Sequence, residues 1–259
     1  FAMLETLRHW IELSVLRVDD AGRWSMSQAS GSSAASTGAG DVAALVRARA
    51  HAMPGDARRL LETSALAREP FTAGHVGAAC ALDEVQALQT VDAALQAQLL
   101  RESGDGFAFM HDLVRSAIVD GIGADRQRLL HRQLALAAEQ LRAHSPGGRA
   151  PSSACIAEHW ELGGEPARAV PHRLAAAKAA LAVFEDAAAE THWAQAGADG
   201  AGLAERVAIA WGRAMVCRNR EDAPGLEQSV AELDALADEA GQHPDTAPTA
   251  LDARIYAAD

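Results

Sequence analysis

Apolar residues recur every three or four positions along most of this chain, which is the spacing that places them on one face of a helix. Within residues 41–98 this spacing predicts four helices. Asp41 suits the cap of the first, Pro54 the first turn of the second, and Thr72 and Asp83 the caps of the third and fourth. The expected buried positions are Val42, Leu45 and Val46; Leu60, Leu61 and Leu66; Val76, Ala79 and Cys80; and Val85, Leu88, Val91, Ala94 and Leu95.

The pattern changes from helical to extended after the fourth helix. Two short runs, Leu99–Glu102 and Phe107–Met110, enclose Ser-Gly-Asp-Gly, a composition that favours a β-hairpin. Asp112 is then expected to cap a helix over Leu113–Asp120. Helices followed by a hairpin are the outline of a winged helix, so we predict a winged-helix domain over residues 41–122.

From Ala124 onward the spacing is helical again. After one long amphipathic helix with Leu129, Leu130, Leu134 and Leu141, shorter helices alternate with glycine- and proline-containing breaks. The breaks are at residues 163–166, 196–202, 221–225 and 241–245, and small residues at expected packing positions are Ala175, Ala179, Ala182, Ala188 and Ala196. This pattern is typical of stacked helix pairs with a loose tetratricopeptide-like (TPR-like) period. We therefore predict a truncated helical-repeat domain over residues 123–259, whose concave face would bind other chains or small ligands.

The N-terminal residues have a different character. Leu4, Leu7 and Ile11 have helical spacing, so residues 1–20 are expected to form the last helix of a preceding domain. Residues 21–40 include a Ser/Gly/Ala stretch without core-forming residues and are expected to be a flexible linker. The chain therefore resembles a fragment of a longer protein.

The composition supports a mostly α fold and excludes some classes of function. Hydrophobic residues make up 49% of the chain but aromatic residues only 4%, as expected for closely packed Ala- and Leu-rich helices. The net charge of −12 argues against a nucleic-acid-binding surface, which needs a basic patch. Lys178 is the one lysine and follows no glycine-rich loop, so a phosphate-binding loop of the Walker type is excluded.

The three cysteines, Cys80, Cys155 and Cys217, are far apart in the sequence. Their scatter indicates buried thiols in a reducing compartment, and a cytoplasmic location, not a disulfide framework or a zinc site. No apolar run reaches the ~18 residues that a membrane span needs. We expect no metal, no cofactor and no membrane contact in this fragment.

One histidine lies where a side chain could report on a bound group. His111 falls at the junction between the second extended run and the helix that follows. A histidine at such a junction is more often a structural hydrogen-bonding residue than a ligand, and spacing alone favours that role. The alternative is that His111 points outward, toward a phosphate on a neighbouring domain.

The sequence around this histidine resembles a known family. FMHDLVRSAI, from Phe109 to Ile118, is similar to the MHD motif of the signal-transduction ATPases with numerous domains (STAND), in particular MalT/LuxR-type bacterial regulators. DVAALVRARAHAMPGDARRLLETSALAREPFTAGHV resembles the first winged-helix helices of these proteins, and RQRLLHRQLALAAEQL with IAEHWELGGEPARAV resembles their passage into helical repeats. FAMLETLR resembles the end of their nucleotide-binding domain. The likeness covers most of residues 1–200.

The resemblance implies a regulatory role. His111 would approach the β-phosphate of ADP on the preceding ATPase domain and hold the resting state, while Asp112 would orient the loop and cap its helix. The P-loop and Walker B residues are not in this chain, so the fragment is expected to be no enzyme, whereas the intact protein would use ADP or ATP with Mg²⁺. The chain would then be the regulatory arm of a transcriptional regulator. Its partners would be the nucleotide-binding domain and an inducer or protein on the repeats.

Two other functions stay open at this stage. The first is a protein-interaction scaffold without nucleotide switching. The second, less favoured, is DNA binding, because the recognition-helix equivalent, Asp83–Gln98, contains Asp83, Glu84 and Asp92 but no arginine or lysine. The basic positions Arg126, Arg128, Arg132 and Arg142 are expected to be a solvated face or to dock on an acidic neighbour.

Catalytic motifs are missing from the sequence. None of the ten histidines lies in H-E-x-x-H, and no serine lies in G-x-S-x-G. His159, Trp160 and Glu161 are expected to pack between helices, and Trp160, Trp193 and Trp211 to be interhelical anchors rather than an aromatic ligand cup.

Overall fold

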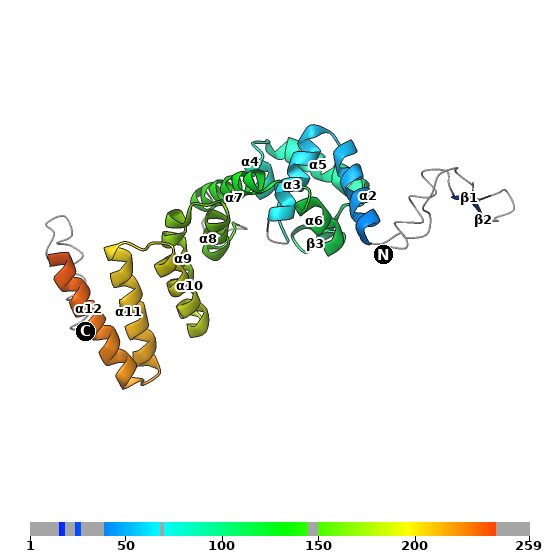
Figure 1. The fold of residues 1–259 in the computed structure, drawn as a ribbon. Coiled ribbons are helices and arrows are strands. Elements are labelled where there is room, and N and C mark those ends of the chain that lie inside the picture. Colours follow the sequence, from blue (N-terminus) through cyan, green and yellow to red (C-terminus); the bar gives the residue numbers. More distant parts are fainter. Residues whose placement is uncertain (1–15, 19–23, 27–38, 68–69, 145–149, 242–259) are drawn as a thin grey trace. The chain divides into compact units, whose positions relative to one another are not determined.

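The computed structural model describes residues 16–18, 24–26, 39–67, 70–144 and 150–241. Within these residues the chain is mostly helical, with eleven helices and two short antiparallel hairpins (Figure 1). This confirms the expected mostly α class with a small β element. The chain divides after Arg126 into two compact units, whereas the sequence predicts the division after residue 122. No helix in the described ranges is long and apolar enough to cross a lipid bilayer.

The first hairpin contradicts the prediction for this region. β1 (Leu16–Val18) pairs antiparallel with β2 (Trp24–Met26). The helix expected over residues 1–20 and the linker expected over residues 21–40 are therefore wrong at these two strands. Leu-Arg-Val and Trp-Ser-Met each alternate apolar and polar residues, which is the period of a strand and not of a helix. The expected helix positions Leu4, Leu7 and Ile11 lie outside the described residues.

In the unit that ends at Arg126, four helices precede the second hairpin and a short helix follows it. The elements are α2 (Ala39–Ala52), α3 (Gly55–Leu66), α4 (Ala73–Ala79), α5 (Glu84–Gln96), β3 (Leu100–Ser103), β4 (Gly106–Phe109) and α6 (Asp112–Val119). Leu60, Leu61 and Val76 are fully buried at its centre.

Local cap chemistry sets the starts of α4 and α5 as predicted. The Thr72 hydroxyl accepts a hydrogen bond from the His75 amide at the start of α4. Asp83 and Gln86 form a reciprocal capping box at the start of α5. Pro54, expected in the first turn of α3, lies one position before the helix, at its N-cap. Helix α2 also differs from the prediction, because it begins at Ala39 and so includes the predicted cap Asp41.

The second hairpin lies close to its predicted position. Ser103 pairs with Gly106, so Gly104 and Asp105 form the turn, and Gly104 has a φ of +56° that glycine adopts without strain. Phe71 adds a single antiparallel bridge to Phe107, with N···O distances of 2.9 and 2.8 Å. A Cβ at Gly106 would lie 2.4 Å from the Phe71 carbonyl oxygen, so the bridge requires glycine there. The hairpin is thereby fixed to the segment that joins α3 and α4.

The buried face of α5 differs in part from the expected one. Ala87, Val91 and Ala94 are buried, but Val85 and Leu88 are 64% and 44% exposed. The three buried residues follow one another at i, i+4 and i+7 and define a single stripe. Val85 and Leu88 lie beside this stripe, so their prediction as core residues was wrong.

The second unit contains the remaining helices. They are most of α7 (Ala124–His144), then α8 (Ser153–Leu162), α9 (Pro166–Ala182), α10 (Asp186–Ala198), α11 (Leu203–Asn219) and α12 (Ala223–Gly241). Breaks occur near the predicted residues 163–166, 196–202 and 221–225, whereas 242–245 lie outside the described residues. A further break at 183–185 was missed because it contains no glycine or proline; Phe184 turns the chain there with a φ of +61°.

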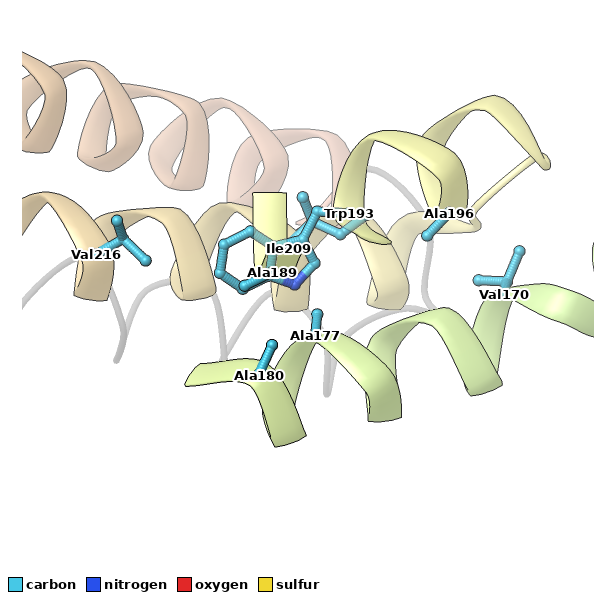
Figure 2. Close-up of a cluster of buried hydrophobic side chains, with 8 residues drawn as sticks. All are labelled: Val170, Ala177, Ala180, Ala189, Trp193, Ala196, Ile209 and Val216. Atoms are coloured by element: carbon cyan, nitrogen blue, oxygen red, sulfur yellow. The ribbon is translucent and has the colours of Figure 1, made fainter. Parts of the chain in front are cut away.

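Neighbouring helices of this unit are joined by small apolar cores. One core consists of Val170, Ala177, Ala180, Ala189, Trp193, Ala196, Ile209 and Val216 from α9, α10 and α11 (Figure 2). In Figure 2 the Trp193 indole lies at the centre of this group, with Ala177 and Ala180 directed toward it from α9. A Cβ at Gly212 of α11 would lie 2.2 Å from the Trp193 ring, so this glycine makes room for the indole.

The alanines of α9 face differently from what was expected. Ala175, Ala179 and Ala182 are exposed, whereas Ala176, Ala177 and Ala180 are buried. In LAAAKAALA nearly every position is equally apolar, so the sequence carries no periodicity that identifies the buried face. On α10, Ala196 is buried and Ala188 is half-buried, as expected. On α7, Leu130 and Leu134 are buried but Leu129 is 45% exposed.

Candidate functional site

The expected sensing residue, His111, lies where the chain leaves the second hairpin. Just before it, the Met110 amide donates a hydrogen bond of 3.0 Å to the Leu99 carbonyl, which continues the strand pairing by one residue. His111 itself is extended, with φ −153° and ψ 150°, and α6 begins at the next residue. The hairpin and the helix thus fix the position of this backbone from both sides.

Helix α6 is held firmly within its unit. Val114, Ala117 and Ile118 are buried, and the Arg115 guanidinium donates from Nε to the Ala65 carbonyl of α3 at 2.9 Å. The His111 carbonyl accepts hydrogen bonds from the Val114 and Arg115 amides at 2.9 and 3.3 Å. The His111 side chain, by contrast, is exposed. An exposed side chain on a backbone held from both sides is what a contact with another domain requires.

The capping role expected of Asp112 is wrong. His111 occupies the N-cap position, its side chain makes no cap hydrogen bond, and Asp112 is the first residue inside α6. An acidic residue in the first turn still stabilises a helix through its dipole, typically by 0.3–1 kcal/mol. The helix begins one residue earlier than expected because the extended His111 already supplies the first carbonyl acceptor.

The charges around His111 limit the anions that it could bind without further cationic groups. An imidazole can donate a hydrogen bond to a phosphate oxygen, and the start of a helix attracts anions. The Asp112 carboxylate, however, is exposed in the same turn and repels an incoming anion. A phosphate at this point would need further cationic ligands from elsewhere. Such ligands are absent from α6, whose one basic residue, Arg115, is bonded to α3.

The alternative DNA-binding surface has the wrong charge. Glu84 and Asp92 are exposed on α5, and between them lie the exposed Val85 and Leu88. The helix contains no arginine or lysine. Carboxylates repel the phosphate backbone, so this face suits a protein surface better than a duplex.

The basic residues of α7 are engaged within their own units. Arg126 forms an ion pair with Glu62, with an Nε···Oε2 distance of 2.7 Å. Arg132 donates to the Gly163 carbonyl at 3.0 Å, and Arg142 to the Pro151 carbonyl at 3.4 Å. The expectation that these arginines dock on an acidic neighbour thus holds for Arg126, whose neighbour is Glu62 of α3.

The tryptophans and their neighbours pack between helices as expected. Trp160 is fully buried, its indole N–H donates to Glu139 at 2.8 Å, and the Arg168 guanidinium lies 3.5 Å above its ring. Trp193 is buried, and the half-buried Trp211 packs on a core of α11 and α12. His159 lies against the buried His131, with 3.0 Å between their Nδ1 atoms. Trp160 and Trp193 are therefore core residues, as expected of interhelical anchors.

Burial is the main cause of the pKa shifts of His131 and Cys80. Removal from water lowers the pKa of His131 to about 4, because the cationic form is poorly solvated there. Burial also raises the pKa of the Cys80 thiol, whose Sγ lies 3.3 Å from the Thr63 hydroxyl. Cys80 and Cys155 are buried and Cys217 is half-buried, and all three are free. The raised pKa of Cys80 fits a packing role, since reactive cysteines have lowered pKa values.

A polar cluster in the second unit was not found from the sequence. The buried Arg173 of α9 holds both carboxylate oxygens of Glu161 of α8, at 2.5 and 2.6 Å. His192 of α10 lies beside this pair, and so does Asp199, the C-cap residue that follows α10. The sequence signal for this cluster is weak, because its members come from different helices and one of these helices, α9, is rich in alanine.

Other kinds of site find no support in the described residues. There, no group of three or more His, Cys, Asp or Glu side chains could hold a metal ion. Lys178 is exposed on α9. Neither a protein-family model, nor a curated protein, nor a solved structure matches the chain.

Proposed function

We propose that the chain is the winged-helix and TPR-like arm of a cytoplasmic multidomain ATPase regulator of the STAND type. In the resting state His111 would contact the phosphate of ADP held by a preceding nucleotide-binding domain. The observation that carries the proposal is the exposed His111 side chain on a rigid backbone, between a hairpin and a buried helix.

The order of elements supports the winged-helix part of this proposal. A winged helix consists of a helix, a short strand, two helices and a two-stranded wing. Helix α3, the Phe71 bridge, α4, α5 and the β3–β4 hairpin follow one another in this order. Because Phe71 pairs with Phe107, the short strand and the wing belong to one small sheet. His111 then leaves this sheet directly after β4.

The packing of the second unit supports a repeat array. Its helices pack against their sequence neighbours, as α8 does on α9 and α11 on α12. Stacked helix pairs bury a continuous core and leave a large surface for binding. A signal bound to this surface would favour release of ADP only if it binds the open state more tightly than the resting state.

The test is to purify both the intact gene product and the present chain, and to extract their bound nucleotide. We expect a Walker lysine motif N-terminal to this chain. We also expect bound ADP in the intact protein and no bound ADP in the chain alone, because the phosphate-binding residues would lie in the preceding domain. A gene product without a Walker motif, or one that retains no ADP, would contradict the proposal.

The second candidate is a protein-interaction scaffold without nucleotide switching. It is favoured by the exposed Val85 and Leu88 on α5, which lie between carboxylates and suit a protein partner. The same purification separates the two functions, since a scaffold needs neither the Walker motif nor the ADP.

A further inference from the structure

A pocket lies between α2, α3 and α6, three helices that pack against one another in the unit that ends at Arg126. It encloses about 340 Å³, part of which is open to solvent. The apolar side chains that line it are at most 7% exposed and come from Ala50, Leu61, Ile118 and Ile122. The polar side chains at its more exposed edge include those of Arg47, Arg58 and Glu62. The pocket thus combines an apolar wall with charged groups.

The charged groups leave an excess of positive charge. Glu62 is already neutralised from outside the pocket, because Nε and Nη2 of Arg126 lie 2.7 and 2.5 Å from its Oε2 atom. Nε of Arg58 lies 4.0 Å from the other oxygen of Glu62, which is too far for a hydrogen bond. The C-terminal end of α6 adds about half a negative charge. Two arginines outweigh this charge, so the pocket is cationic in a chain whose net charge is −12.

Packing, and not a carboxylate, sets the position of Arg47. A Cβ at Gly121, just after α6, would lie 3.2 Å from Cδ of Arg47, so glycine leaves room there for the stem of this side chain. The Gly121 amide donates to the Ile118 carbonyl at 3.0 Å and holds the turn in place. Within the described residues, the Arg47 guanidinium has no ion-pair partner. Its donors are therefore available to a ligand.

We propose that this pocket binds a small organic monocarboxylate that carries an apolar group. The carboxylate accepts hydrogen bonds from Arg47 and Arg58, because planar guanidinium groups match carboxylate oxygens in geometry and charge. The apolar group lies against the buried wall that includes Leu61 and Ile118. The Glu62 carboxylate at the edge repels a dianion such as phosphate more strongly than a monoanion. This site depends neither on His111 nor on a nucleotide, so its test is independent of the proposed function.

The test titrates the chain with hexanoate and follows the amide signals by ¹H–¹⁵N NMR spectroscopy. We expect saturable shifts at Ala50, Ile118 and Gly121, with a dissociation constant of about 1 mM, as for a small ligand in a partly open pocket. The first control, 1-hexanol, has the same chain without the charge and should bind at least about fivefold more weakly. The second, inorganic phosphate, lacks the apolar chain and should also bind at least about fivefold more weakly. Equal binding of either control would overturn the assignment to an apolar monocarboxylate.

Substitutions test the two arginines. Arg47→Gln and Arg58→Gln should each weaken hexanoate binding about fivefold, the upper end for a partly exposed ion pair. The matched control is Arg101→Gln, which removes an exposed arginine from β3 of the same unit and should leave the affinity unchanged. Equal affinity in all three variants would overturn the proposal.

A further measurement needs no substitution. At saturating hexanoate, the unsubstituted chain should show nuclear Overhauser effects between the hexanoate methyl group and the methyl groups of Leu61 and Ile118, which line the wall. The absence of these effects, or shifts that do not saturate, would overturn the proposal even if an arginine variant failed to fold.

Discussion

Gly212 allows a quantitative test of the packing between α10 and α11. An alanine Cβ at this position would lie 2.2, 2.8 and 2.9 Å from three atoms of the Trp193 ring, closer than carbon atoms can approach. The indole, which is buried among α9, α10 and α11, must therefore move (Figure 2). Overpacking of a core typically costs 1–3 kcal/mol.

Two effects of opposite sign decide the outcome of Gly212→Ala. Alanine is favoured over glycine inside a helix by about 1 kcal/mol, which would stabilise the variant. The displaced indole outweighs this gain, because both the ring and its neighbours are buried. We expect a net loss of about 1–2 kcal/mol in the free energy of unfolding, measured by urea titration with far-ultraviolet circular dichroism.

The control is Gly197→Ala on α10, where an added Cβ meets nothing within 4 Å. This variant should be as stable as the unsubstituted chain, or more stable by up to about 1 kcal/mol. The double variant Gly212→Ala, Trp193→Phe should lose less than the sum of its two single changes, because the smaller ring relieves the overlap. Equal stabilisation by both glycine substitutions would refute the described packing.

Two further predictions concern single residues. Burial lowers the pKa of His131 to about 4, so the neutral side chain contributes fully to the stability of the fold above its ordinary pKa of 6.5, and this contribution is lost as the pH falls toward 4. The free energy of unfolding should fall by up to about 3 kcal/mol over this range. His131→Asn should remove this pH dependence. An unchanged slope between pH 6.5 and 4 in the variant would exclude the role. Asp83→Ala breaks the capping box of α5 and should lower the free energy of unfolding by about 1 kcal/mol. The control Asp92→Ala, in the middle of the same helix, should change it by less than about 0.5 kcal/mol. Equal losses of stability in thermal unfolding would argue against the cap.

Features set by a few adjacent residues could be predicted from the sequence. The caps at Thr72 and Asp83 and the Gly-Asp turn of the second hairpin depend on side chains within three residues of the backbone that they bond. The hairpin β1–β2 was missed although its alternation is visible, because its strands are short and adjoin a helical pattern.

Features that depend on which face of a helix is buried were harder to predict. In α9 the alanine-rich sequence supports several faces equally, and tertiary packing selects Ala176, Ala177 and Ala180. The Phe184 turn carries none of the usual glycine or proline signals.

The candidate sites likewise contain features that could be predicted from the sequence and features that could not. The position of His111 between a strand and a helix was evident from the sequence, but the N-cap role of His111 itself was not. The cluster of Glu161, Arg173, His192 and Asp199 arises only when α8, α9 and α10 pack together. Long-range pairing of this kind has no local signature.

The most direct test of the proposed function is the rate of ADP release from the intact protein with His111→Ala. A hydrogen bond to a charged group contributes about 1.5–3 kcal/mol, so loss of the imidazole should speed release by about 10- to 100-fold. The control is His51→Ala, which removes an exposed histidine from α2 of the same unit and should leave release unchanged. Release that is equally slow in both variants would contradict a contact between His111 and the nucleotide.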